Sequence, residues 1–485
     1  MNNLLGSGRN HQTMKRLLLN SLLLAGAITL HAAEQSRNPN IVLIVSDDMG
    51  YADLGFTGVK DIKTPNLDRL AAAGTFFTDA YVTGPICVPS RMGIMTGRNQ
   101  ARWGVYNNNG GQWPEGQKRT AAETTIAEIF QQAGYATALF GKWHLCGGRA
   151  EQRVAEAVPE RNGFDEVEMI PGGMSGFWAG APLYRAGGGT VKAPEYLTDH
   201  FGKLAVGFIE RHKEKPFFLA LTFNAVHAPL HALDADKQAN GEIAAMDRRT
   251  YAGMMTAMDR NIGQVLDAIA AAGLEPNTIV AFLSDNGGPA PDAEGHSRNA
   301  SGNGPLRGYK FDVWEGGVRT PMVMKWPGHI PSGKRFAGLS SSMDLGATFL
   351  AAAGLSAPAD KPLDGVNLLP FLNGEKTGDP HDALFWECRW FPKPDCAARS
   401  GTWKIVQREV GPNGPDPAMW QLFDLGKDIG EQNNLAAQHP ERVREMDKAF
   451  RNWRAQMAAP IQAPKPGAKK PATSKAIDSQ FPQAE

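Results

Sequence analysis

The chain has 485 residues, of which 42% are hydrophobic, 21% charged and 8% aromatic, so it can bury a large core and is typical of a globular protein with one large and one smaller domain. Its 50 lysines and arginines balance 50 aspartates and glutamates, which gives a formal net charge of zero. No global field therefore favours nucleic acid or an acidic membrane as a partner, and any selectivity for anions must be local.

Residues 14–33 have the pattern of a signal peptide. A basic pair at 15–16 precedes an apolar run over 17–30 and small residues at 32–33. The run is shorter than the roughly 20 residues of a transmembrane helix, and no later stretch is apolar enough to span a membrane. We therefore assign residues 1–33 to a signal region and expect export, to the periplasm or out of the cell.

Four apolar runs, rich in β-branched or aromatic residues, predict strands that are buried on both faces. These runs are residues 40–46, 135–141, 216–223 and 278–284. Helical patterns lie between them, over residues 65–73, 125–133, 197–211 and 251–272. This alternation predicts an α/β fold with a large, mostly parallel sheet sandwiched by helices.

Polar side chains follow each predicted strand. They are Asp47 and Asp48, then Lys142 and His144, then Asn224 and His227, and finally Asp285 and Asn286. One pair of acids alone is most often a helix cap or a solvated turn. Because ligands bind beyond the carboxyl ends of parallel strands, four such clusters predict a site at this edge of the sheet.

The acids of this edge indicate a metal site. Asp47, Asp48 and Asp285 would repel one another and have raised pKa values unless a cation neutralised them. With the Asn286 amide, all candidate ligands are oxygen donors, which favours Ca²⁺ or Mg²⁺ over zinc. Calcium, with about 6 to 8 oxygen ligands, fits if residue 87 and a substrate oxygen complete its shell, and Mg²⁺ is the alternative.

The stretch over residues 84–98, GPICVPSRMGIMTGR, places Cys87 at the mouth of a predicted helix. Pro89 suits a first helical turn, and Gly97 would end the helix. The start of a helix favours developing negative charge and bound oxyanions, so it is a suitable place for a nucleophile. A lone cysteine is most often core filler, and the chemical interpretation therefore depends on its neighbours.

The pattern C-x-P-S-R followed by T-G-R resembles the signature of the sulfatases, in which the cysteine is oxidised to formylglycine. Other motifs stand in the order typical of that family: the strand ending in DD, then GKWH, the His227–Ala228–Pro229 turn, SDNGG, GPLRGYKFDVWEGGVRTP and QLFDLGKDIGEQNNLA. The resemblance covers residues 38–434. It implies a sulfuric ester hydrolase with an alkaline-phosphatase-like catalytic domain.

The resemblance implies a hydrated aldehyde, a gem-diol, at position 87. One hydroxyl would attack the sulfur of a sulfate ester and form a covalent sulfated intermediate. The metal ligands would be Asp47, Asp48, Asp285 and Asn286, with formylglycine 87 adding an oxygen. A formylglycine-generating enzyme would be a partner during maturation.

The remaining catalytic roles also follow from the resemblance. Arg91 and Lys142 would hold the diol in its reactive form. His144 would remove the proton of the second hydroxyl, which expels sulfate and regenerates the aldehyde. His227 and Lys310 would bind the sulfate oxygens or protonate the leaving alcohol.

For the substrate we expect a sulfated saccharide. Export and the long glycine-rich passage over 145–195, which contains Trp178, indicate a substrate-facing loop. Arg389 and Trp390 in the C-terminal part add a cation and an aromatic face that suit a sulfated sugar. We therefore take these three side chains as candidate substrate contacts.

Two rival functions stay open. The first is a phosphoester or phosphonate ester hydrolase of the same fold, against which Cys87 in its full motif favours sulfate. The second is a secreted, non-catalytic protein that binds a sulfated glycan and whose Cys87 is never converted. Tyr309 and Phe311 are bulkier than the residues often found there in sulfatases, which concerns the fit of the substrate rather than the chemistry.

The C-terminal part has a different pattern. Short strands over 383–387, 403–407 and 420–425 and a helix over 440–457 predict an antiparallel α+β subdomain, 376–457, on a catalytic domain of residues 34–375. The tail over 458–485 is rich in Pro, Ala and Lys and is predicted to be disordered. Cys388 and Cys396 are close enough in sequence for a local disulfide, which the sequence leaves open.

Overall fold

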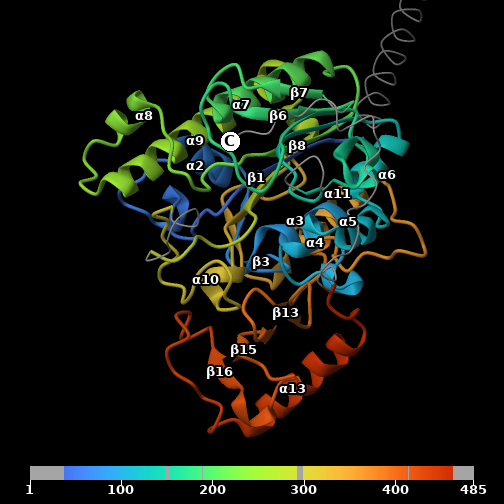
Figure 1. Ribbon diagram of the computed structural model, residues 1–485, viewed down its shortest axis with the longest axis vertical. Coiled ribbons are helices and arrows are strands. Elements are labelled where there is room, and N and C mark those ends of the chain that lie inside the picture. The colour runs from blue at the N-terminus through green and yellow to red at the C-terminus, as the bar shows by residue number, and fades with distance from the viewer. Residues whose placement is uncertain (1–37, 148–152, 188, 292–298, 413, 463–485) are drawn as a thin grey trace, which may run out of the picture.

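The computed structural model describes residues 38–147, 153–187, 189–291, 299–412 and 414–462. The predicted signal region lies outside the described residues, as does most of the predicted tail. Figure 1 shows a large α/β body with a smaller body, coloured orange to red, beneath it. No helix of the described residues is long and apolar enough to cross a membrane.

The large body is built on a ten-stranded sheet with the order β11-β2-β10-β9-β1-β8-β4-β5-β6-β7. Its centre consists of the four predicted strands, all parallel: β9 (Thr278–Ser284), β1 (Asn40–Ser46), β8 (Phe217–Thr222) and β4 (Ala136–Lys142). Each is buried along its whole length. The predicted fold class is therefore confirmed.

Shorter strands extend this sheet at both edges. On one side lie β5 (Glu166–Ile170), β6 (Pro182–Arg185) and β7 (Gly189–Lys192). On the other side lie β10 (Met322–Lys325), β2 (Thr75–Phe77) and β11 (Lys334–Phe336). The prediction of a loop over 145–195 is thus wrong in part: β5 extends the sheet beside β4, and the short strands β6 and β7 form a hairpin next to it.

Helices cover both faces of the sheet, which explains the continuous apolar runs of the central strands. Val42 and Ile44 of β1 belong to the core under α2 (Pro65–Ala73), α7 (Leu197–Arg211) and α9 (Met246–Ala271). The intervening residues, such as Leu43, face α3 (Cys87–Thr96), α6 (Ile126–Gln132) and α11 (Met343–Ala352). Figure 1 shows these two groups of helices on different sides of the central strands.

The smaller body is an antiparallel sheet of four strands with one long helix. The strands are β13 (Leu384–Cys388), β14 (Asp395–Ser400), β15 (Trp403–Gln407) and β16 (Gln421–Asp424), and the helix is α13 (Pro440–Ala455). The sequence predicted three of these strands. It did not predict β14, because DCAARS lacks the apolar alternation of a half-buried strand.

The hypothesis of a disulfide between Cys388 and Cys396 is wrong, since both are free thiols. The register pairs Cys388 with Asp395 and Cys396 with Glu387. The two thiols pack into different cores on opposite faces of the small sheet, because successive side chains of a strand alternate between its faces.

The predicted disorder of the tail also needs a correction at its start. Ala458 N–H donates to Ala101 O at 3.0 Å, and Ile461 N–H donates to Gly104 O at 3.0 Å. Ile461 also packs against the core on the α3 side of the large sheet. Residues 458–462 are thus fixed by backbone pairing that composition alone does not reveal, and residues 463–485 lie outside the described residues.

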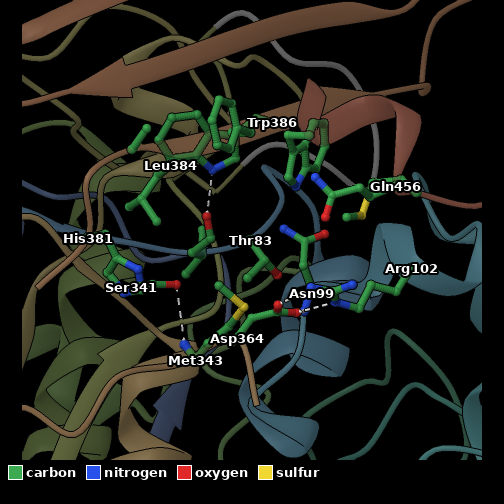
Figure 2. A pocket seen from close by; sticks show the side chains of 15 residues that line it. Thr83, Asn99, Arg102, Ser341, Met343, Asp364, His381, Leu384, Trp386 and Gln456 are labelled. Atoms are coloured by element: carbon green, nitrogen blue, oxygen red, sulfur yellow. Dashed lines mark hydrogen bonds and ion pairs between the residues drawn. The ribbon is translucent and has the colours of Figure 1, made fainter. Parts of the chain in front are cut away.

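A cavity of about 160 Å³ lies between the two bodies. Figure 2 shows its lining, with Asn99, Arg102 and Asp364 from the large body and Trp386 and Gln456 from the C-terminal part. None of the predicted site residues is among the residues that line it. This cavity is thus distinct from the edge of the sheet where the polar clusters gather.

Candidate active site

The register of the central strands brings the two acidic segments together. Ser46, the last residue of β1, pairs with Ser284, the last residue of β9. Because the strands are parallel, Asp47 and Asp285 follow at the same level of adjacent strands. The Asp48 amide also donates to Asp285 Oδ1 at 3.2 Å. The structure thus places these predicted ligands at one edge.

Helix α3 brings the candidate nucleophile to this edge. Cys87 is its first residue, and all ten residues of the helix are buried. The helix ends at Gly97, which has φ of 65°, a conformation that glycine adopts without strain. Cys87 Sγ lies 3.8 Å from Asp47 Oδ1 and 3.5 Å from Lys142 Nζ.

Three ion pairs join the buried acids to buried bases. Lys142 Nζ lies 2.6 Å from Asp47 Oδ2, Lys310 Nζ lies 2.6 Å from Asp48 Oδ2, and Arg91 Nε lies 2.9 Å from Asp285 Oδ2. The three carboxylates are therefore matched by three cations of the chain itself. The inference that repulsion among the acids requires a metal is thus incomplete, because the sequence did not reveal these pairings.

The donor set nevertheless fits a hard divalent ion. Oxygens of Asp47 and Asp285 lie within 4.8 Å of each other and of Cys87 Sγ, and Asp47 and Asp48 belong to a second such group. Asn286 Nδ2 donates to Asp48 Oδ1 at 2.7 Å, but its buried Oδ1 has no hydrogen-bond partner among the described residues. A free amide oxygen beside carboxylates is a suitable ligand for calcium or magnesium.

His227 lies beside the Lys310–Asp48 pair. Its Nδ1 lies 2.6 Å from Ala228 O, and since a carbonyl only accepts, Nδ1 carries the proton and Nε2 has the lone pair. Nε2 faces Lys310 Nζ at 3.5 Å. Burial lowers the pKa of His227 to about 4, although Asp48 raises it, so the imidazole is neutral at pH 7.

His144 follows β4 in a left-handed conformation, with φ of 63°. Its ring lies against Gly173, where a Cβ would come within 2.3 Å of the ring. Burial, together with the charges of Lys142 and Arg91, holds the pKa of His144 well below its usual value. Its Nδ1 has no hydrogen-bond partner among the described residues, so His144 is a neutral imidazole suited to accept a proton.

The Cys87 thiol itself is a poor nucleophile. Burial raises its pKa to about 12, even though Lys142 and Lys310 lower it. Since the thiolate is the reactive form of cysteine, an unmodified Cys87 would be neutral and unreactive at pH 7.

The structure adds three polar residues for which no role was predicted. Asn224 is buried, and neither atom of its amide has a partner among the described residues; the same holds for the Ser90 hydroxyl. Asn299 Nδ2 donates to Asp48 O at 2.8 Å and so supports the acidic turn. The strand end at Asn224 was a usable signal, whereas Asn299 lies in a polar, glycine-rich segment without any pattern.

Two of the predicted substrate contacts are exposed and stacked on other rings. Trp178 is 44% exposed and stacks on His231, with ring centroids 5.4 Å apart. Trp390 is 45% exposed and stacks on Phe311, with centroids 4.5 Å apart. His231 follows His227 in the same loop, and Phe311 follows Lys310, so both stacks belong to segments that carry site residues.

The guanidinium of Arg389, a predicted substrate contact, is held by other residues of the chain. Its Nε lies 2.5 Å from Glu387 Oε1, and its guanidinium lies over the ring of Tyr106. The charge of Arg389 is therefore already paired in the folded chain.

A buried helix start and an edge of alternating acids and bases, set beyond the carboxyl ends of the central parallel strands, are typical of an enzyme that binds an anionic substrate. The sulfatase family model matches residues 39–355, and the model described as N-sulphoglucosamine sulphohydrolase, C-terminal, matches residues 309–456. The chain belongs to the sulfatase family and is a sulfuric ester hydrolase.

Similar proteins and solved structures agree with this family assignment. N-acetylgalactosamine-6-sulfatase of Canis lupus familiaris is 34% identical over 390 residues, which cover 74% of this chain and 71% of the relative. The uncharacterized sulfatase YdeN of Escherichia coli (strain K12) is 30% identical, with 86% and 85% covered. The crystal structure of Ps i-CgsB superposes with a TM-score of 0.78 at 33% identity and covers 87% of this chain and 94% of that chain.

Proposed function

We propose that this sulfatase acts on a sulfated saccharide with a formylglycine made from Cys87 and a bound calcium ion. The observation that carries the proposal is the arrangement around Cys87. Lys142, Arg91 and Lys310 converge there from three separate segments and pair with the acids that would hold the ion.

The charge of the site supports an anionic substrate. The three acids and three cations of the chain cancel, and both histidines are neutral, so a divalent ion would leave the site with an excess positive charge. Preorganised positive charge in a buried site stabilises the charge that develops on sulfate oxygens during attack at sulfur. A magnesium ion would supply the same charge, and calcium is preferred because its coordination is less strict.

The chain's own residues have separate tasks in this mechanism. A formylglycine at position 87 would supply the attacking oxygen, and the metal would polarise that oxygen and the sulfate. Lys142 and Arg91 orient the group at position 87, from 3.5 Å in the case of Lys142 Nζ. The neutral His144 accepts a proton when sulfate leaves. Lys310 is cationic, because Asp48 outweighs the effect of burial and raises its pKa, so it binds sulfate oxygens.

His227 completes the set at the leaving-group side. Its Nε2 lies 3.5 Å from Lys310 Nζ, so the two side chains lie together where they can bind the oxygen of the leaving alcohol.

Two kinds of observation support a saccharide. The first is the pair of exposed aromatic rings, Trp178 and Trp390, on loops that carry site residues. The second is the relatives: the canine one is named for N-acetylgalactosamine 6-sulfate, and Ps i-CgsB has been crystallised with k-i-k-neocarrahexaose. Export, as the signal pattern predicts, would bring the enzyme to saccharides outside the cell or in the periplasm.

Peptide mass spectrometry across Cys87, on protein from its native host, tests this proposal. The expected result is the mass loss of thiol-to-aldehyde conversion by a formylglycine-generating enzyme. Purified protein should then release sulfate from sulfated oligosaccharides and from a small aryl sulfate, and lose activity with EDTA. An unmodified thiol in a host competent for the conversion would refute the proposed nucleophile, and preferential turnover of a phosphonate ester in competition would refute the substrate class.

A further inference from the structure

The backbone that carries Lys310 is bonded to two other segments of the site. Lys310 N–H donates to Gly288 O at 3.0 Å, just after the acidic end of β9. Phe311 N–H donates to Pro85 O at 2.8 Å, just before Cys87. A shift of Phe311 would therefore move both Lys310 and the entry to the nucleophile helix.

Phe311 has a strained backbone. Its φ is 81°, in the left-handed region that aromatic side chains rarely adopt. Such a conformation is unfavourable for a non-glycine residue and persists only where the surroundings determine it. The strain places Phe311 N–H on Pro85 while the Lys310 ammonium remains 2.6 Å from Asp48 Oδ2.

The contacts that hold Phe311 come from the small sheet. Its ring stacks on Trp390 with an interplanar angle of 18°. Trp390 lies in the connection between β13 and β14, which is anchored where Arg389 N–H donates to Tyr106 O at 3.2 Å. The next residue, Asp312, pairs with Arg408 of the C-terminal part at 3.1 Å.

We infer that Trp390 and Phe311 are positioning residues of the catalytic site: the stack fixes the strained Phe311, and Phe311 fixes the Lys310 ammonium over the sulfate. The inference rests on the proposed function, in which Lys310 binds sulfate oxygens. It gives Trp390 an effect on the chemical step that is independent of any contact with a sugar.

A double-mutant cycle on a small aryl sulfate, which has no sugar for Trp390 to bind, tests the inference. Trp390→Ala should lower kcat about tenfold with little change in KM, because misplaced catalytic groups cost rate rather than binding. Trp390→Phe, which keeps a stacking ring, should restore most of kcat. In a Phe311→Gly background, which removes both ring and strain, Trp390→Ala should have no further effect.

Phe391→Ala is the matched control, because Phe391 is equally exposed in the same connection, whereas the stack on Phe311 is made by Trp390. It should leave turnover of the aryl sulfate unchanged. The inference is overturned if Trp390→Ala also leaves aryl sulfate turnover unchanged, or if its effect persists in the Phe311→Gly background. If Trp390→Ala changes only the KM for a saccharide, Trp390 contacts the sugar and does not position the site, which also overturns the inference.

A second readout does not require turnover or a folded Phe311→Gly variant. Calorimetric binding of inorganic sulfate should be several times weaker for Trp390→Ala than for wild type and for Trp390→Phe, because Lys310 is displaced. Equal binding by all three overturns the inference. Failure of the proposed function is distinguishable, since wild type with converted Cys87 would then hydrolyse no sulfate ester at all.

Discussion

At the scale of single residues, the site is a buried set of paired charges. Lys142 and Arg91 each contact two other residues of this set. Lys142 Nζ contacts both Asp47 and Cys87, and Arg91 pairs with Asp285 while it donates to Lys142 O at 2.8 Å. Removing one member would leave the partner charge buried and unpaired, which costs about 3–5 kcal/mol. Neutral members such as Asn286 and Asn224 are therefore the better probes of function.

Asn286→Ala should weaken calcium binding without disturbing the balance of charges. It removes the unpartnered Oδ1, a candidate ligand, and two hydrogen bonds of Nδ2. We expect at least about tenfold weaker calcium binding to EDTA-treated protein by calorimetry. Wild type should lose thermal stability in EDTA and regain it with calcium, whereas undiminished affinity in the variant would exclude Asn286 as a ligand.

Asn224→Leu should make the protein more stable and less active. A buried amide with neither atom paired among the described residues destabilises the fold, and an apolar side chain of similar shape removes that cost of about 1–3 kcal/mol. We expect a higher melting temperature and a lower kcat/KM, because the amide faces the ligand edge of the sheet. A lower melting temperature would show that Asn224 has a structural role.

The structure brings together residues that the sequence named for this site, and each of them follows a strong strand or lies in a long motif. The sequence did not reveal which acid pairs with which base, since Asp48 and Lys310 lie 262 positions apart. The stack of Phe311 on Trp390 was hidden for the same reason. Partners so distant depend on the packing of two bodies, which no local pattern encodes.

At the scale of elements, β4 shows how one glycine allows Lys142 to lie at the edge of the sheet. Gly141 precedes Lys142 and has φ of 122°. A Cβ there would lie 1.8 Å from Thr222 O of the neighbouring β8. The two strands can therefore approach only if this residue is glycine.

Gly141→Ala should destabilise the protein by more than about 3 kcal/mol, because both the conformation and the space are unsuitable. Gly134→Ala is the control: its φ is 86°, but no atom lies within 4 Å of its Cβ position, so strain alone should cost about 1 kcal/mol. Urea unfolding of the two variants measures the difference. Equal losses would mean that the contact with Thr222 is relieved by a small shift.

The elements that the sequence predicted are the long ones. β1 and β9 were predicted to the residue, and α2 and α7 likewise, because their apolar patterns are complete. The strands it did not predict have two to six residues or little apolar alternation. Their stability comes from the strand beside them, as in the case of β14 between β13 and β15.

At the scale of the whole molecule, the small sheet is joined to the Lys310 segment by buried charges. Lys404 of β15 lies 2.8 Å from Glu315 Oε1 and 3.0 Å from Glu431 Oε1, and all three side chains are fully buried. Glu315 N–H also donates to Glu431 Oε2 at 2.8 Å. The C-terminal part therefore helps to hold the segment that carries Lys310 in place.

Lys404→Met should destabilise the protein by about 3–5 kcal/mol, because Glu431 would lose the cation it pairs with. The double variant Lys404→Met/Glu431→Gln should recover a large part of that loss. Urea unfolding with an activity assay at low temperature measures both effects. No recovery in the double variant would mean that Glu431 contributes little beyond its own hydrogen bonds.

Stability should also depend on pH at the junction of the two bodies. His381, which Figure 2 shows in the lining of the cavity, lies 2.7 Å from the buried Asp344. Burial lowers its pKa, but Asp344 outweighs this and raises the pKa above its usual value. The stabilisation is therefore fully present below about pH 6.5 and is lost as the pH rises through the raised pKa.

Urea unfolding across this pH range should show a decline in the free energy of unfolding for wild type and a smaller decline for His381→Gln. Parallel curves for the two proteins would assign the decline to other groups.

The complete burial of α3 has a consequence for the order of events during biosynthesis. The helix is enclosed by a sheet whose strand β1 needs β8 and β9 as neighbours, and Asn286 lies 238 positions after its partner Asp48. While a ribosome makes those later strands, the Cys87 segment has nothing to close over it. A modifying enzyme would therefore have to act in that interval, before export or folding is complete. If Cys87 is converted as proposed, protein that folds first would keep its thiol, so the active fraction of a preparation would depend on the rate of conversion relative to the rate of folding.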